Sequence, residues 1–335
     1  MTLATVAILT YNGERYLDEI LVAVERQAVA GEVEILVIDS GSSDRTLEIV
    51  AAHPRVRLHR IPNQEFGHGR TRDLAARLAT GEYVAYLTHD ATPASDTWLA
   101  EILAPMIDDD RIVAVLGRQV PRPHCHPMLK YEILGTFARL GPEFGTSVFR
   151  DSGAFASRAE FESAAFYSDV NSAARRGVLT GAVPYRDVSY AEDQLFGRDV
   201  LTAGLRKAYT PRAAVIHSND MTIREAGRRA YEETTGLRRI GTSIPPMTRG
   251  KVVRLVLGGA LRDSVRIVRD RQWGLFTRLR WLFVNPGYVV SKWVGHRRAT
   301  LAAVDVEPAA LGPLPSAKQP LQSPGDPAAD TDEAV

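Results

Sequence analysis

Apolar, β-branched runs alternate with segments of helical period over the first third of the chain. The apolar runs cover residues 5–12, 34–41, 56–62 and 83–90. Each is followed by a stretch in which apolar residues recur every three or four positions, such as SSDRTLEIVAA after the second run and HGRTRDLAARLATG after the third. This alternation predicts repeated strand–helix units and therefore an α/β fold with a mostly parallel, doubly wound sheet.

The pattern is less regular between about 113 and 223. It predicts a strand VAVLGRQV, a helix near 129–140, a helix beginning EDQLFGRDVL and a strand AAVIHS. From Thr222 onward the chain becomes helical. In GKVVRLVLGGALRDSVRIVRDRQWG, basic residues recur at helical spacings and leave Val and Leu on the remaining sides.

Composition and charge divide the chain into three parts. With 335 residues, of which 45% are hydrophobic, it can build a sizeable core, and its single Cys125 favours a reducing cytoplasm. Between Arg224 and Arg298, 17 Lys and Arg stand against five Asp and Glu, whereas the last 35 residues are acidic and rich in Pro and Ala. We expect a main domain over 1–223, a basic amphipathic helical region over 224–300 and a disordered tail over 301–335.

Polar residues follow three of the predicted strands at the edge where doubly wound sheets bind ligands. These are Thr10 to Asn12, Asp39 to Asp44 and Thr88 to Asp90. The first strand is not followed by the glycine pattern of dinucleotide-binding or P-loop proteins. Carboxylates without a glycine loop favour a nucleotide whose diphosphate is held by Mg²⁺ or Mn²⁺, and Asp90 is placed to bind that metal.

Seven motifs in order resemble glycosyltransferase family 2, which has the GT-A fold, and within it the rhamnosyltransferase-like branch. The resemblance covers roughly 4–222. It is carried by AILTYNGERYL, ILVIDSGSSDRT, FGHGRTRDLAARLATGEYVAYLTHDATP, GRQVPRP, FYSDVNSAARR, YAEDQLFGRDVLTAG and IHSND. It implies that the main domain is a nucleotide-sugar-binding catalytic domain.

The resemblance also implies roles for individual residues. Asp193 is the expected catalytic base, while Asp90 and His217 are the expected metal ligands. The remaining positions are expected around the donor: Thr10, Asn12, Asp39, Asp44, Arg70, Arg72, Thr88, His89, Asp169, Asn171 and Glu192. The family's metal-binding Asp-x-Asp is here Thr88-His89-Asp90. One Asp, His217 and diphosphate oxygens can still build an octahedral shell for Mg²⁺ or Mn²⁺.

Several of these residues also have a purely structural interpretation. Asp39 and Asp44 could cap the helix that starts near Arg45, and Asp90 could cap the helix after Pro93. His217 could be a structural histidine, Arg70 and Arg72 solvated helix residues, and Asp169 and Asn171 outward residues of a strand. The sequence His124-Cys125-His126 lacks the ligand spacing of a zinc site, so we expect a surface loop there.

The basic helical region predicts a membrane surface as a partner. Its positive excess is interleaved with aromatic residues: Trp273, Phe276, Trp281, Phe283, Tyr288 and Trp293. Aromatic rings at headgroup depth and basic residues near anionic lipid are typical of peripheral attachment, here to the inner face of the plasma membrane. The helices resemble no nucleic-acid recognition motif and the main domain is acidic, so we expect no nucleic-acid partner.

These observations lead to one functional hypothesis and two alternatives. We expect an inverting glycosyltransferase that moves L-rhamnose from dTDP-rhamnose to a lipid-linked or glycan acceptor in cell-envelope polysaccharide biosynthesis. The alternatives are a transferase with a UDP-hexose donor and a non-catalytic nucleotide-sugar-binding scaffold. The acceptor linkage, the metal and the oligomeric state do not follow from the sequence.

Overall fold

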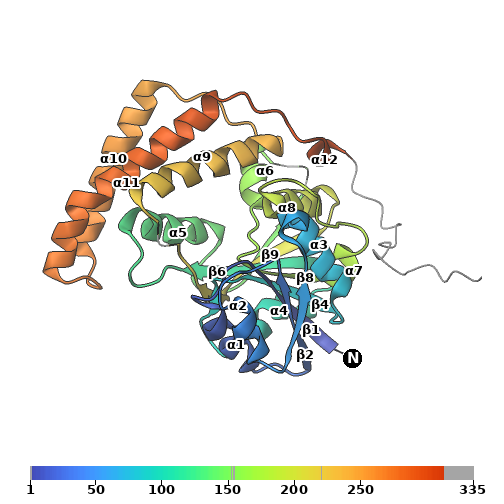
Figure 1. Ribbon diagram of the computed structural model, residues 1–335. Helices are drawn as coiled ribbons and strands as arrows, with labels where there is room; N and C mark the ends of the chain where they lie inside the picture. The colour runs from blue at the N-terminus through green and yellow to red at the C-terminus, as the bar shows by residue number, and fades with distance from the viewer. Residues whose placement is uncertain (1, 152, 154, 220, 313–335) are drawn as a thin grey trace, which may run out of the picture.

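The computed structural model describes residues 2–151, 153, 155–219 and 221–312. In this part of the chain a nine-stranded sheet is flanked by helices on both faces, and further helices form a separate layer beyond α5 (Figure 1). The strands are β1 (Thr2–Thr10), β2 (Glu32–Asp39), β3 (Val56–Arg60), β4 (Tyr83–Thr88), β5 (Thr92–Pro93), β6 (Ile112–Val120), β7 (Ser147–Arg150), β8 (Asn171–Arg175) and β9 (Arg206–Ile216).

The helices follow the predicted order and extend beyond it. They are α1 (Leu17–Glu25), α2 (Thr46–Ala51), α3 (His68–Leu78), α4 (Trp98–Asp108), α5 (Pro127–Leu140), α6 (Arg158–Ala165), α7 (Arg176–Leu179), α8 (Glu192–Thr202), α9 (Ile223–Arg239), α10 (Arg249–Arg269), α11 (Leu275–Leu301) and α12 (Pro308–Leu311).

The strand order is β3-β2-β1-β4-β8-β6-β9-β5, with β7 paired to β9. Pairing is parallel from β3 through β4 and between β6 and β9, which confirms the predicted mostly parallel, doubly wound sheet. β8 runs antiparallel between β4 and β6. The ends of β1, β2, β4 and β9 therefore lie along one edge.

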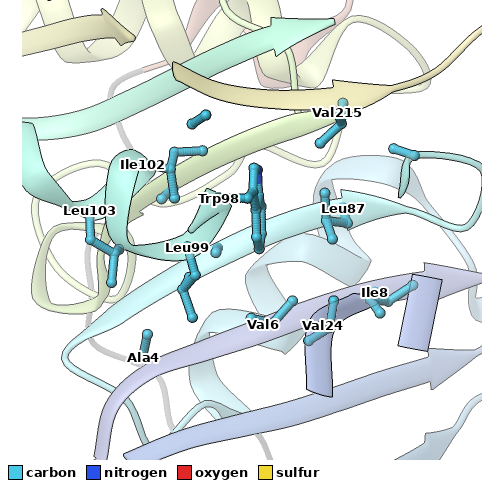
Figure 2. Packing of buried hydrophobic residues seen from close by; sticks show 14 of the residues in the cluster. Ala4, Val6, Ile8, Val24, Leu87, Trp98, Leu99, Ile102, Leu103 and Val215 are labelled. Carbon is cyan, nitrogen blue, oxygen red and sulfur yellow. The ribbon is translucent and has the colours of Figure 1, made fainter. Parts of the chain in front are cut away.

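Alternation along the strands builds a core on each face of the sheet. In β1, Val6 and Ile8 point to one face and Ala7 to the other, because successive strand side chains alternate. The first face packs on α1 and α4 around the fully buried Trp98 (Figure 2). Both faces are covered, which explains why the strands read as continuous apolar runs.

The basic helices pack on one another and on α5 rather than standing apart. Helix α9 lies along α11, and the two backbones approach closely at Gly227 and Gly295. A Cβ on Gly295 would lie 2.0 Å from the Gly227 carbonyl oxygen, so a larger residue there would separate the helices. Helix α5 lies between the sheet and the α10–α11 hairpin (Figure 1). None of the described helices is both long and apolar enough to cross a bilayer.

Two segments differ from the sequence predictions. The prediction of disorder from residue 301 is wrong up to residue 312, because Arg186 donates to the carbonyl of Ala309 and Glu307 accepts from the Ser189 amide at 3.0 Å. The rest of the tail lies outside the described residues. The predicted surface loop at 124–126 is wrong for Cys125 and His126, which are buried; His126 caps α5 and stacks on Tyr288.

Candidate active site

The ends of β1 and β2 form the first part of the site. Thr10 pairs with Asp39 across the two strands, so their loops start side by side. Asp39 Oδ2 accepts from the backbone amides of Gly41 and Ser42 at 3.0 and 3.1 Å, and Asn12 Oδ1 accepts from the Ser43 amide at 2.9 Å. These bonds fix the shape of the crevice that the sequence predicts around the nucleotide.

Asp44 also stabilises the loops after β1 and β2. Its Oδ1 accepts from the Thr46 amide at the start of α2, and its Oδ2 accepts from the Glu14 amide at 3.1 Å. The structural interpretation of Asp44 as a helix-start residue is therefore met, although the formal N-cap is Arg45. Burial by itself raises the pKa of Asp44, but the hydrogen bonds from Thr46 and Glu14 together lower this pKa below its ordinary value, so Asp44 stays charged.

The hydroxyl of Thr10 lies at the end of β1, beside Gly13. Thr10 Oγ1 is buried and makes no hydrogen bond within the described part of the chain, which is unusual for a buried polar atom. Glycine at position 13 makes room here, since a Cβ would lie 2.7 Å from Thr10 Oγ1 and 3.3 Å from the His89 Cβ. A ligand hydrogen-bonded to Thr10 would satisfy it.

Asp90 and His217 meet where β4 and β9 end. His217 Nε2 lies 3.4 Å from Asp90 Oδ2, and His217 Nδ1 lies 3.0 Å from Gln119 Oε1. A metal-binding histidine commonly donates its second ring nitrogen to an oxygen acceptor, and Gln119 supplies that acceptor. The carboxylate of Asp90 is the ligand type that Mg²⁺ and Mn²⁺ prefer, and the imidazole of His217 points to the same place, so the pair fits a divalent metal.

The surroundings keep Asp90 ionised. Burial by itself raises the pKa of a carboxyl, but hydrogen bonds from His217 and Thr88 hold the pKa of Asp90 well below its ordinary value. Thr88 Oγ1 donates to Asp90 Oδ1 at 2.6 Å. The described residues contain no cluster of three or more His, Cys, Asp or Glu side chains arranged for a metal. The remaining metal ligands would have to come from the diphosphate of a nucleotide sugar or from water.

A cavity of about 500 Å³ is lined by both His217 and Asp193. Asp193 lies in the first turn of α8. One side of it consists of Gln119, Ser168 and His217 at the sheet, and the other side comes from α5, α9 and α11. Asp193 Oδ1 accepts from the Gln194 amide at 2.7 Å, which fixes the carboxylate in the cavity wall. The predicted base and a predicted metal ligand therefore line the same cavity.

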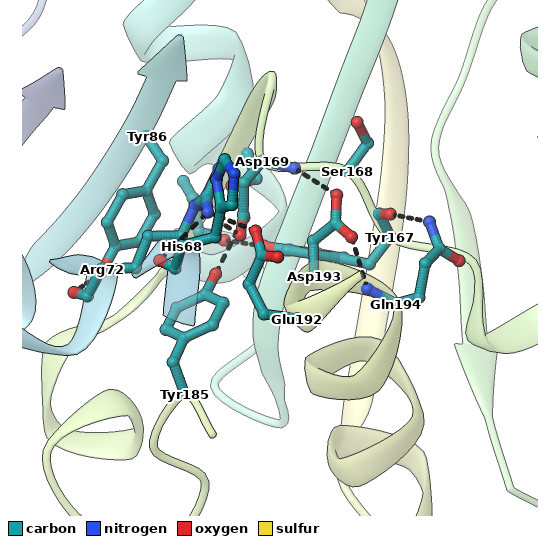
Figure 3. Close-up of polar contacts among 12 residues, drawn as sticks. His68, Arg72, Tyr86, Tyr167, Ser168, Asp169, Tyr185, Glu192, Asp193 and Gln194 are labelled. Carbon is teal, nitrogen blue, oxygen red and sulfur yellow. Dashed lines mark hydrogen bonds and ion pairs between the residues drawn. The ribbon is translucent and has the colours of Figure 1, made fainter. Parts of the chain in front are cut away.

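A buried ion network lies behind Asp193 (Figure 3). Arg72 pairs with Asp169 at 2.9 Å and with Glu192, while Asp169 also accepts from Ser172 and Tyr185. Burial and the negative charges of Glu192 and Asp169 raise the pKa of Asp193 well above its ordinary value. Asp193 lies in the first turn of α8, where the helix dipole lowers the basicity of a carboxylate; burial and the two negative charges have the larger effect and make Asp193 a stronger base.

Three predicted donor-binding residues bond to other parts of the protein. Asn171 is fully buried; its Oδ1 accepts from Trp98 Nε1 at 2.9 Å and its amide donates to backbone carbonyls of Arg118 and Ala213, so these bonds give it a structural role. Asp169 is 1% exposed and pairs with Arg72, so it too has a structural role. Arg70 is exposed and pairs with Asp187 at 2.9 Å, outside the lining of the cavity.

The sequence missed several residues that the structure brings into the cavity. Gln119 was quoted within GRQVPRP, but nothing in that motif indicates its contact with His217. Arg229 and Glu233 of α9 line the cavity and pair with each other at 2.6 Å. Their spacing of four marks one helix face, but only the packing of α9 shows that this face meets the catalytic cavity.

Comparison with known proteins identifies the family. The model of "Glycosyl transferase family 2" matches residues 5–180. The chain is 30% identical over 234 residues to the O-antigen chain rhamnosyltransferase RfbN of Salmonella typhimurium, covering 68% of this chain and 70% of the relative. The chain belongs to glycosyltransferase family 2. It is 30% identical over 232 residues to the O-antigen chain rhamnosyltransferase WbaN of Salmonella anatum, again covering 68% and 70%.

A solved structure supports the GT-A fold of this glycosyltransferase. The mannosyltransferase of Pyrobaculum calidifontis, in complex with GDP-Man and Mn²⁺, has a TM-score of 0.54 and 19% identity, and covers 88% of this chain and 86% of its own. The predicted family and fold are thus confirmed.

Proposed function

We propose that this glycosyltransferase transfers L-rhamnose from dTDP-rhamnose, with inversion, to a lipid-linked or glycan acceptor in cell-envelope polysaccharide biosynthesis. One observation carries the proposal of transfer: Asp193 and His217 line a single cavity. A base and the leaving-group side of a donor can therefore act on one anomeric carbon. The two O-antigen rhamnosyltransferases at 30% identity support the choice of sugar.

The proposed chemistry uses one base. Asp193 takes the proton of the acceptor hydroxyl as the hydroxyl oxygen attacks the anomeric carbon from the face opposite the diphosphate. The bond between the sugar and the diphosphate oxygen breaks as the new glycosidic bond forms. The raised pKa of Asp193 suits this role, because a carboxylate with a higher pKa accepts a proton more readily.

Asp90 and His217 would hold a divalent metal, with Gln119 keeping the His217 ring in place. When bound, such a metal stabilises the negative charge of the departing diphosphate. Thr10 and the loops of Asp39 and Asp44 form the crevice proposed for the nucleoside, and Thr88 and His89 lie between that crevice and Asp90. The unpaired Thr10 Oγ1 supports a ligand in this crevice.

A thermal-unfolding panel tests the donor and the metal together. A ligand that binds only the folded protein raises the unfolding temperature. We expect dTDP-rhamnose with Mn²⁺ or Mg²⁺ to give the largest increase, and chelator to reduce it. A larger increase with a UDP-hexose would instead establish the alternative donor. Product formation in the same samples distinguishes a transferase from a binding scaffold.

The outer surface of α10 and α11 supports peripheral membrane attachment. Five apolar residues of α10 recur at spacings of four, four, four and three, so they lie on one face. Each is between 43% and 69% exposed: Val253, Leu257, Leu261, Val265 and Val268. A second outward stripe on α11 contains Phe276 and Phe283, which are 86% and 92% exposed. With the surrounding arginines, these stripes suit an anionic bilayer at the inner face of the plasma membrane.

A further inference from the structure

A second cavity, of about 240 Å³, lies between α5, α10 and α11. We call it the basic cleft. Four basic side chains and two carboxylates line it: Arg139, Arg262, Arg266, Lys292, Glu132 and Asp263. Because basic groups outnumber acidic ones here, the cleft favours an anion.

The guanidinium groups of Arg262 and Arg266 on α10 have N–H groups available to donate hydrogen bonds to a ligand. Arg262 Nε and Arg266 Nη1 each lie 3.8 Å from Asp263 Oδ1, which is too long for a hydrogen bond. Within the described part of the chain, neither guanidinium donates a hydrogen bond, and the two side chains are 67% and 44% exposed. Arginine forks match phosphate oxygens in a bidentate way, so a phosphate or diphosphate suits the cleft better than a monodentate anion.

The basic cleft adjoins the catalytic cavity. The two share four lining residues, Met128, Glu132, Thr136 and Lys292. Lys292 Nζ donates to Glu132 Oε1, so an ion pair stands at the junction. A molecule bound in the cleft by its phosphate would therefore have its attached sugar on the Asp193 side of this junction.

The apolar stripe of α10 passes next to the cleft. Leu261 and Val265 directly precede Arg262 and Arg266, and they are 69% and 43% exposed. A lipid chain could stay on the outer, apolar face while its charged end reaches the arginines. The apolar stripe, the basic cleft and the catalytic cavity thus lie in the same order as the lipid, the phosphate and the sugar of a lipid-linked sugar.

We propose that the basic cleft binds the diphosphate of a prenyl-diphosphate-linked acceptor and so presents the acceptor sugar to Asp193. This rests on the proposed function for the identity of the site next to it. The site differs from the one at Asp90 and His217, because it needs no metal and holds the acceptor's diphosphate rather than the donor's. The α10–α11 hairpin would then bind the acceptor in addition to the membrane.

Binding of farnesyl diphosphate to the full chain tests this, with farnesol as the uncharged comparison and EDTA present so that no metal assists binding near Asp90. We expect calorimetry to detect farnesyl diphosphate but not farnesol. The double variant Arg262→Gln/Arg266→Gln should raise the Kd ten-fold or more. The matched control, Arg254→Gln/Arg269→Gln, removes the same charge from α10 outside the cleft and should leave the Kd unchanged.

Three outcomes would overturn the proposal: equal weakening by both double variants, equal binding of farnesol, or unchanged binding to the cleft variant. Vesicles of phosphatidylglycerol distinguish a lipid headgroup as the source of phosphate. Suppose that the cleft variant loses vesicle binding much more than its control, while farnesyl diphosphate binds both variants equally. The cleft would then bind lipid headgroups, and the proposal of an acceptor site would be wrong. Donor-induced thermal protection, unchanged in every variant, shows that they fold.

The failure of the proposed function gives a different result. Asp193→Asn should bind farnesyl diphosphate as tightly as the native protein, because Asp193 does not line the basic cleft. If that variant still transfers sugar, the assigned base is wrong while the cleft is untouched. If sugar transfer stops and farnesyl diphosphate still binds, the results support both the assigned base and the acceptor site.

Discussion

His217 Nε2 lies 3.4 Å from Asp90 Oδ2, although the two residues follow different strands far apart in the sequence. Strand β5 begins two residues after Asp90 and pairs with the end of β9, with Thr92 opposite Ile216, and this pairing brings Asp90 next to His217. Gln119, near the end of β6, holds the second nitrogen of the His217 ring. Three strand ends thus cooperate in one candidate metal site.

Removing either candidate metal ligand should abolish metal-dependent donor binding. We expect Asp90→Asn and His217→Ala to lose the Mn²⁺-dependent thermal protection by nucleotide sugar. Gln119→Leu should weaken metal affinity about 10- to 100-fold, because it frees the His217 ring to rotate. Metal titrations followed by unfolding temperature measure this. His124→Ala, at an exposed histidine, is the control, and full metal protection in His217→Ala would rule out that ligand.

Asp193→Asn should stop transfer without preventing donor binding. Loss of a general base lowers kcat by about 10²- to 10⁴-fold, while the amide keeps the size and most hydrogen bonds of the side chain. Initial rates and donor-induced thermal protection report the two effects separately. Asp110→Asn removes an exposed carboxylate elsewhere and should leave kcat unchanged. A kcat within a factor of a few of the native value would sink the assignment of the base.

The pH profile should reveal the raised pKa of Asp193. A base must be deprotonated, so activity falls as the pH drops through its pKa, and this decrease should occur at a higher pH than for an ordinary aspartate. Glu192→Gln removes a negative charge that helps to raise this pKa, so the decrease should move to lower pH. Profiles of kcat against pH measure the shift. Movement in the opposite direction would contradict the electrostatic explanation.

Lys207 should make the protein more stable as the pH rises. Burial lowers the pKa of this fully buried lysine from 10.5 to about 7. Between these values the unfolded chain binds more protons than the folded protein, so the free energy of unfolding rises with pH by at most about 1.4 kcal/mol per pH unit. Its hydrogen bond to the Phe166 carbonyl, 2.8 Å long, favours the charged form and reduces that slope.

Urea unfolding at pH 7.5 and pH 9.5 measures this contribution. We expect the native protein to gain stability between the two pH values through Lys207 and Lys207→Met to lack that gain. The matched variant, Lys251→Met, removes an exposed lysine and should behave like the native protein. An identical pH dependence in the native protein and Lys207→Met would show that burial does not perturb this lysine.

Charge on the apolar stripe of α11 should weaken membrane binding. Phe276→Asp/Phe283→Asp places two carboxylates where the rings are expected to enter the headgroup layer, opposing both apolar burial and attraction to anionic lipid. Flotation with phosphatidylglycerol vesicles measures the bound fraction, which should fall several-fold. Phe144→Asp changes a ring that is 75% exposed outside the hairpin and should have little effect. Deleting the helical region is a poorer test, because Arg229 and Glu233 of α9 line the catalytic cavity.

From the sequence alone follow β1 to β4, β6, β9 and most of the helices. Periodicity fixes which residues can share a strand face, and the rule that ligands bind beyond the carboxyl ends of parallel strands then selects Thr10, Asp39 and Asp90. The motif resemblance added Asp193 and His217. The fold prediction is confirmed because it depends on short stretches of chain and on the general geometry of α/β sheets.

Only the tertiary structure decided which polar residues face the cavity and which are enclosed. Asp169 and Asn171 lie two residues apart in one motif, yet Asp169 pairs with Arg72 and Asn171 accepts a hydrogen bond from Trp98. Likewise, the face of α9 that completes the cavity follows from its close contact with α11 at Gly227. Local periodicity identifies a helix face, but the direction of that face depends on packing between segments distant in the chain.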